Sequence, residues 1–129
     1  MEDSLEKRIF IITPVREITE DEKQFLDTYI AQLESQGYKV HFPPRDTEQT
    51  DIVGLDICTA NREAIRRATE IQIYWNAKSA GSKFDFGMVF MAEKPITLIN
   101  RDAVLQTPYK SFENVLLALD DKYREQKKA

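Results

Sequence analysis

The chain has 129 residues, of which 42% are hydrophobic and 31% charged, and its formal net charge is -4. This length fits one domain over residues 1–129 and allows burial of roughly two-thirds of the surface exposed on unfolding. The composition is that of a folded globular protein and excludes a disordered chain. The acidic balance argues against a nucleic acid polymer as partner, because such proteins usually present a basic face.

The single cysteine, Cys58, excludes an intramolecular disulfide framework and fits a reducing compartment. The charged first residues carry no apolar signal segment, and no apolar run is long enough to span a membrane. We therefore expect a cytoplasmic protein without a membrane contact.

Four apolar segments predict strands. Residues 8–15 form a continuous apolar run, typical of a strand buried on both faces of a parallel sheet. The other three predicted strands span residues 38–42, 71–75 and 95–100.

Helices are predicted between these strands. Thr19 and Glu22 form a capping-box signature, and Gly37 occupies the usual glycine position after a helix. Further helices are expected over residues 52–69 and 82–92, with residues 45–51 as a loop, and Thr107-Pro108 opens a last helix. The alternation predicts an α/β protein with a parallel sheet of four to five strands and helices on both faces, a three-layer sandwich.

Ligands in such sheets bind beyond the carboxyl ends of the strands, where the strand order reverses. If the order is 2-1-3-4, the reversal lies between the first and third strands. The segments expected to meet there are residues 13–16 and 76–82.

The segment 75–90 carries the most specific pattern. Ser79, Gly81 and Ser82 form a turn of small residues before a helix, whose amino end favours a phosphate or carboxylate. Ser82 with Asp85 is also a capping box, which needs no ligand. Gly87 lies inside the predicted helix, where glycine costs about 1 kcal/mol, so either close packing on the sheet or a ligand is expected beside it.

The pattern Gly81-Ser82-x-x-Asp85-x-Gly87, followed by Lys94-Pro95, resembles the Gly-Thr-x-x-Glu-x-Gly…Lys-Pro segment of nucleoside 2-deoxyribosyltransferases and nucleotide N-glycosidases. The resemblance implies a flavodoxin-like (Rossmann-type) fold and cleavage or exchange of a base–sugar bond. In that family a carboxylate attacks the anomeric carbon, which requires no metal and no cofactor.

By resemblance, Asp85 is the catalytic carboxylate. The residues implied to hold the phosphate, sugar or base are Thr13, Pro14, Arg16, Ser79, Gly81 and Ser82. Asn76 is expected to orient the ligand. Trp75 is either a stacking platform for a base or a core residue, since it ends a strand at the predicted crevice.

Two features depart from the family pattern. Asp85 is one methylene shorter than the family glutamate, and the helix before the third strand carries Asn61 where a second carboxylate is expected. Asp46, Asp51 and Asp56 are the acids that stand closest to replace it. A non-catalytic sensor for a nucleotide or an ADP-ribose-type ligand is therefore the alternative. A third reading is an NAD-cleaving domain related in fold to Toll/interleukin-receptor domains.

His41 and Cys58 are interpreted as lightly packed and packed residues, and the absence of further histidines and cysteines disfavours zinc. Acids are missing at the strand ends where a receiver domain needs them, and no Gly-x-Gly-x-x-Gly follows the first strand. By resemblance we expect a homodimer or larger homo-oligomer, because the helix over residues 82–92 is apolar nearly all round. Its expected core stripe is Phe84, Met88 and Met91, with Phe86, Val89 and Phe90 facing the partner.

Overall fold

The computed structural model describes residues 6–128, and its centre is a four-stranded parallel sheet. The strands are β1 (Arg8–Ile12), β2 (Lys39–His41), β3 (Glu70–Ile73) and β4 (Ile96–Leu98). They pair in the order β2-β1-β3-β4, which confirms the predicted order and the reversal between the first and third strands. Each strand ends before its predicted apolar run does, because the last residues of the run lie beyond the strand. In addition, β2 and β4 begin one residue later than predicted, and β3 begins one residue earlier.

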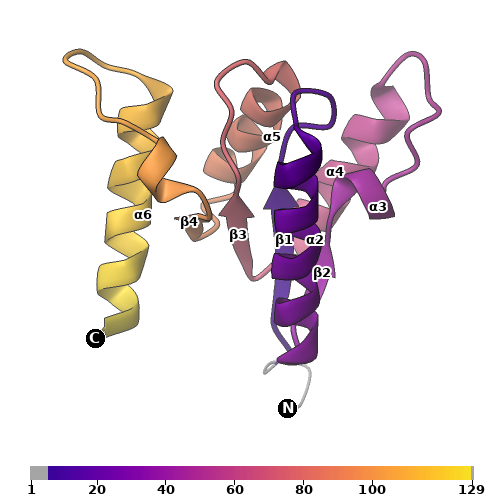
Figure 1. Ribbon diagram of the computed structural model, residues 1–129, viewed down its shortest axis with the longest axis horizontal. Helices are drawn as coiled ribbons and strands as arrows, with labels where there is room; N and C mark the ends of the chain where they lie inside the picture. The colour runs from indigo at the N-terminus through magenta and orange to yellow at the C-terminus, as the bar shows by residue number, and fades with distance from the viewer. Residues whose placement is uncertain (1–5, 129) are drawn as a thin grey trace.

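Helices cover both faces of this sheet (Figure 1). The helix α2 (Glu20–Ser35) lies on one face, and α4 (Leu55–Arg67) and α5 (Ala80–Met91) lie on the other. The last helix, α6 (Phe112–Lys128), runs beside β4 at the edge of the sheet. The short elements are α3 (Pro43–Asp46) and the 3-10 helix η1 (Arg101–Ala103). The three-layer α/β sandwich is thus confirmed.

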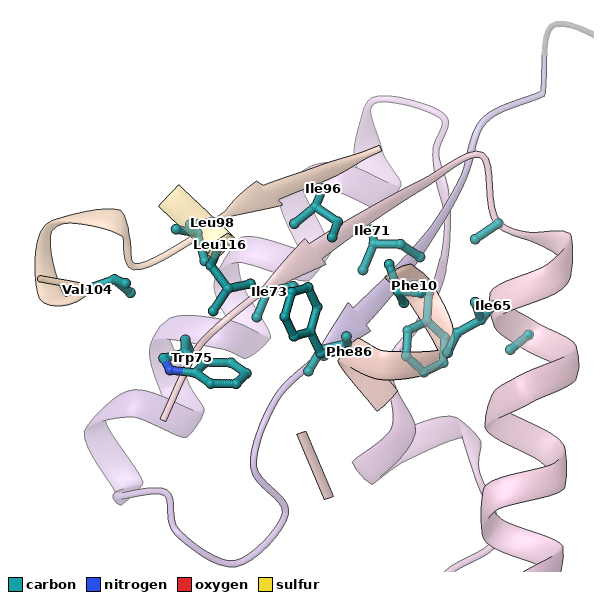
Figure 2. Close-up of a cluster of buried hydrophobic side chains, with 14 residues drawn as sticks. Phe10, Ile65, Ile71, Ile73, Trp75, Phe86, Ile96, Leu98, Val104 and Leu116 are labelled. Carbon is teal, nitrogen blue, oxygen red and sulfur yellow. The ribbon is translucent and has the colours of Figure 1, made fainter. Parts of the chain in front are cut away.

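The larger hydrophobic core lies between the sheet and the helices α4, α5 and α6 (Figure 2). Phe10 and Ile12 of β1 alternate with Ile9 and Ile11, which face α2 instead. All four side chains are at most 1% exposed, so β1 is buried on both faces as its unbroken apolar run predicts.

Local signals set the limits of α2. Thr19 accepts a hydrogen bond from the backbone N–H of Glu22, and Glu22 accepts one from the backbone N–H of Thr19. This reciprocal pair is the predicted capping box. At the other end Gly37 has a φ of 97°, a left-handed conformation that favours glycine.

The limits of four helices differ from the sequence predictions. The helix expected over residues 52–69 is α4, which begins at Leu55 after Gly54 and ends at Arg67. The helix α3 overlaps the start of the loop expected over residues 45–51. It begins at Pro43 and Pro44 because their fixed φ suits the first helical positions. The helix α5 begins at Ala80 rather than Ser82, with Ser79 as its N-cap. The last helix begins at Phe112, because the hydroxyl of Ser111 accepts from the backbone N–H of Asn114.

The orientation of α5 also differs from the expectation. Phe86 and Val89 are buried, whereas Phe84 and Met91 are 56% and 84% exposed. A helix that is apolar on all sides has no unique core stripe, so sequence periodicity could not choose its inner face. Here the inner face is the one that lets Phe86 pack edge-on against Trp75 and Phe112.

The sheet edge at β4 is held to α6 by one buried carboxylate. Asp120 is 0% exposed, and it accepts a hydrogen bond from the backbone N–H of Leu98 at 2.9 Å. Arg101 and Arg124 form ion pairs with the same carboxylate. These hydrogen bonds and charges hold the pKa of Asp120 below its usual value despite the opposing effect of burial.

Within residues 6–128, we find no helix with the length and apolar character needed to cross a membrane.

Gly87 faces open space, which excludes close packing on the sheet within this chain, one of the two expected explanations for this glycine. A methyl group added at Gly87 meets no atom within 4 Å. Gly87→Ala should therefore raise the free energy of unfolding by about 0.5–1 kcal/mol, since alanine is the better helix former. Urea unfolding of both proteins measures this difference.

Gly37→Ala is the matched control. Its φ of 97° penalises any side chain, so this variant should lose roughly 1–2 kcal/mol. A loss of stability in Gly87→Ala as well would show that a neighbouring surface requires the bare backbone at position 87.

Candidate functional site

The loops that follow β1 and β3 meet at the carboxyl edge of the sheet, as the strand order predicts. The last rung of this pairing is a hydrogen bond from the backbone N–H of Tyr74 to the carbonyl of Ile12 at 2.8 Å. Beyond it, the side-chain amide of Asn76 donates to the carbonyl of Glu17 at 3.1 Å and accepts from the N–H of Lys78 at 2.9 Å. Asn76 therefore ties the two loops together.

A cavity of about 350 Å³ opens where these loops face α3, α4 and the start of α5. This size lies at the lower end of the usual range for small-molecule sites. The residues that line it are Thr13, Val15, Arg16, Glu17, Pro43, Gln49, Ile57, Cys58, Asn61, Ser79, Ala80, Gly81, Ser82, Phe84 and Asp85.

Most of the predicted site residues line this cavity. Those present in its wall are Thr13, Arg16, Ser79, Gly81, Ser82 and Asp85. Pro14, Trp75 and Asn76 are not among the lining residues. Trp75 is 6% exposed and packs in the core, where its indole N–H donates to Glu113 at 2.8 Å.

The amino end of α5 forms one wall of the cavity. The hydroxyl of Ser79 accepts from the backbone N–H of Ser82 at 3.1 Å and so caps the helix. Ser82 therefore lies inside the first turn and is not the cap, which corrects the capping box expected for Ser82 and Asp85. The Ser82 hydroxyl is buried and has no hydrogen-bond partner within residues 6–128. A buried hydroxyl without a partner is costly, so Ser82 lowers the stability of the folded protein at this site.

Asp85 follows Ser82 by one helical turn and lines the same cavity. Its carboxylate makes no hydrogen bond or ion pair with the residues that the structure describes. Burial without such compensation raises the pKa of Asp85 to about 7. A carboxyl group that titrates near neutrality in a cavity is a common property of catalytic groups.

Asn61 of α4 contributes a neutral polar group to the cavity wall. It is 6% exposed, and its Oδ1 accepts a hydrogen bond from the hydroxyl of Thr47 at 2.7 Å. The same hydroxyl lies 2.8 Å from Nε2 of His41. The only histidine is thus half-buried, which fits the lightly packed residue expected, and it is connected to Asn61 through Thr47.

None of the aspartates considered as a second carboxylate lines the cavity. Asp46 pairs with Arg45 and accepts from the N–H of Phe42, and Asp51 accepts from the N–H groups of Val53 and Asp56. Glu17, which sequence reasoning missed, lies in the cavity wall beside Arg16. Glu17 directly follows the predicted turn 13–16, and this position could have indicated that it lies in the cavity wall.

Two further residues of the cavity were not expected there. Cys58, interpreted from the sequence as a packed helix residue, lines the cavity, as does Gln49 from the loop before α4. No group of three or more His, Cys, Asp or Glu side chains within residues 6–128 is arranged to hold a metal ion.

No family model matches the chain, and no curated protein matches its sequence. Solved structures do match. A CMP N-glycosidase from Clostridium botulinum superposes with a TM-score of 0.57 and 18% identity, over 89% of this chain and 84% of that one. A 2-deoxyribosyltransferase from Bacillus psychrosaccharolyticus gives a TM-score of 0.58 and 17% identity, over 87% of this chain and 95% of that one.

A third similar structure is a 2-deoxyribosyltransferase from Leishmania mexicana, with a TM-score of 0.55 and 16% identity. That match covers 71% of this chain and 63% of the other. At these identities the likeness establishes the fold. It confirms the flavodoxin-like architecture that the motif around Asp85 implied.

The raised pKa of Asp85 makes a prediction about stability that needs no ligand. A carboxyl group whose pKa rises from 3.8 to about 7 on folding binds more protons in the folded state across that range. The folded state is therefore favoured at low pH and loses up to about 4 kcal/mol as the pH rises from about 4 to about 7, with little further change above that. Asp85→Asn removes this dependence, so the variant should become the more stable protein within this range and remain so above pH 7.

Urea unfolding of wild type and Asp85→Asn across this pH range measures the difference. Asp102→Asn is the control, because Asp102 is exposed in η1 and outside the cavity. Parallel pH profiles for wild type and Asp85→Asn would contradict the raised pKa.

Proposed function

We propose that this protein cleaves or exchanges the bond between base and sugar of a nucleoside or nucleotide, with Asp85 as the reacting carboxylate. The observation that carries the proposal is the Asp85 carboxylate itself, which is uncompensated and shares its cavity with the unpartnered hydroxyl of Ser82. The names of the similar structures, an N-glycosidase and two 2-deoxyribosyltransferases, support the same class of substrate.

In the proposed reaction, ionised Asp85 attacks the anomeric carbon as the bond to the base nitrogen breaks. The bonding electrons leave with the base, which takes a proton from solvent or from an acid in the site. An ester between Asp85 and the sugar results, and attack by water or by a second base releases it. Water gives hydrolysis, whereas a second base gives transfer.

The amino end of α5 supplies the proposed binding groups. Ser79, Gly81 and Ser82 would hold the 5′-phosphate or sugar hydroxyls, because a helix amino end favours negative charge. Arg16 would pair with the phosphate or contact the base, together with Thr13 and Pro14. Trp75 and Asn76 would contribute indirectly. Trp75 would support the core beneath the cavity, and Asn76 would hold the two loops together. The reaction requires no metal and no cofactor.

The first test is release of free base from a panel of nucleosides and nucleotides. Wild type should release base from at least one compound, and Asp85→Asn should lower the rate by about a thousandfold or more. Because the attacking group is the carboxylate, the rate should rise with pH through about 7. Chromatography of the products measures both effects.

Asp102→Asn is again the control and should retain the wild-type rate. Base release that persists in Asp85→Asn would contradict the role of Asp85. A rate that falls as the pH rises through 7 would assign Asp85 as a proton donor instead of a nucleophile.

The alternative is a sensor that binds a nucleotide or an ADP-ribose-type ligand without turnover. The observation in its favour is Asn61, an amide where the resembled enzymes carry an acid. Thermal stabilisation without base release would support the sensor. Cys58, the only cysteine, gives a second measure of occupancy, because a ligand in this cavity should protect its thiol from alkylation.

We further propose that two copies of the chain associate through the outer face of α5. Phe84, Phe90 and Met91 are 56%, 58% and 84% exposed, and all three lie on α5. An exposed apolar surface of this kind usually marks an interface.

Sedimentation velocity at micromolar concentration tests this proposal. Wild type should sediment as a dimer, and Met91→Glu should sediment as a monomer because it places a charge in the interface. Tyr109→Glu is the control, since Tyr109 is 85% exposed but lies in the loop before α6. A monomeric wild type would contradict the proposal.

A further inference from the structure

Asn61 is connected by hydrogen bonds to two residues that do not line the cavity, Thr47 directly and His41 through Thr47. His41 lies at the end of β2, and Thr47 follows α3, where its backbone N–H donates to the carbonyl of Pro43 at 3.0 Å. The Thr47 hydroxyl joins them, 2.8 Å from Nε2 of His41 and 2.7 Å from Oδ1 of Asn61. Thr47 is 5% exposed, so water competes little for this chain of hydrogen bonds.

The number of available protons fixes the direction of these two hydrogen bonds. A threonine hydroxyl has one hydrogen, and Thr47 donates it to Asn61, so Thr47 must accept from His41. His41 therefore carries its proton on Nε2. The ring is fixed in place by stacking on Phe10, with centroids 5.4 Å apart and an interplanar angle of 10°. Burial lowers the pKa of His41, which favours the neutral ring.

This direction determines which part of the Asn61 amide is free. Oδ1 of Asn61 is occupied by Thr47, so the free part of the amide is its Nδ2 group. This nitrogen has no hydrogen-bond partner within residues 6–128, yet it is not sealed from solvent. Since Asn61 lines the cavity, its two N–H donors are available there.

We propose that His41 and Thr47 are positioning residues that keep the Nδ2 donors of Asn61 turned toward the cavity, so that this wall recognises a hydrogen-bond acceptor of the ligand. The proposal rests on the proposed function for the identity of the ligand, a nucleoside or nucleotide. A carboxylate at position 61 would offer acceptors and a negative charge, whereas this amide offers donors without charge. Acceptor atoms of the base or sugar are therefore the expected contacts.

The first experiment needs no ligand and no variant. His41 is the only histidine, so the ring nitrogen signals of ¹⁵N-labelled wild type belong to it alone. Spectra at neutral pH should show a neutral ring protonated on Nε2. A proton on Nδ1 would reverse the chain, with Asn61 donating to Thr47 and presenting oxygen to the cavity, and would overturn the proposal.

Asp46, Arg45 and Arg67 are the charged groups that act on His41, so their effect is checked in the same spectra by titration. Protonation below neutral pH should add the second proton at Nδ1 and leave the bond from Nε2 to Thr47 in place. Loss of that bond on protonation would overturn the proposed direction.

The second experiment separates binding from chemistry. Thr47→Val removes the hydroxyl at nearly constant shape, so the Asn61 amide is free to turn. KM should rise about tenfold while kcat changes by less than about twofold, as expected for one lost hydrogen bond in binding. Thr47→Ser keeps the hydroxyl and should restore the wild-type KM. An unchanged KM in Thr47→Val, with its unfolding midpoint preserved, would overturn the proposal.

The two proposals fail in different ways. If wild type releases no base, the proposed function fails, while the histidine spectra still test the positioning chain. If Asp85→Asn abolishes base release and Thr47→Val leaves KM unchanged, the function stands and the positioning role is rejected.

Discussion

The hydrogen bond from the N–H of Tyr74 to the carbonyl of Ile12 is the last rung between β1 and β3, and the cavity depends on it. Because the two strands are parallel neighbours with crossovers on either side, both following loops leave the sheet at the same edge. Asn76 then joins these loops, and the second loop delivers the Ser79 cap of α5. Asp85 reaches the cavity wall as a result of backbone pairing that lies outside the cavity.

Strand order, layer arrangement and six cavity residues were predictable from the sequence, because apolar runs and helix signals are local. The inner face of α5 was not, since a helix with apolar residues all round leaves the choice to distant partners such as Trp75 and Phe112. Glu70 shows the same limit: it is only 4% exposed at the start of β3, one residue before the predicted strand. Its hydrogen bonds with Gln72 and Tyr123 make that burial tolerable.

The capping residue of α5 decides how Asp85 is interpreted. If Ser82 were the N-cap, the Asp85 carboxylate would accept a hydrogen bond from the backbone N–H of Ser82, and this bond would stabilise its charge. With Ser79 as cap, Asp85 lies beyond the first turn and finds no donor among the described residues. Burying this carboxylate without a donor lowers the free energy of unfolding. A ligand that donates a hydrogen bond to the carboxylate would offset part of that cost. Uncompensated polar groups of this kind reduce stability and are typical of functional sites.

Asp120 has a consequence for how this protein can associate. The outer strand of a sheet exposes unpaired backbone groups, which invite another chain to extend the sheet. At β4 the carboxylate of Asp120 takes the N–H of Leu98, and the guanidinium of Arg124 lies 3.4 Å from the carbonyl of the same residue. Side chains thus occupy the positions that a fifth strand would need. Edge-to-edge extension of the sheet is therefore blocked at Leu98, on the β4 side.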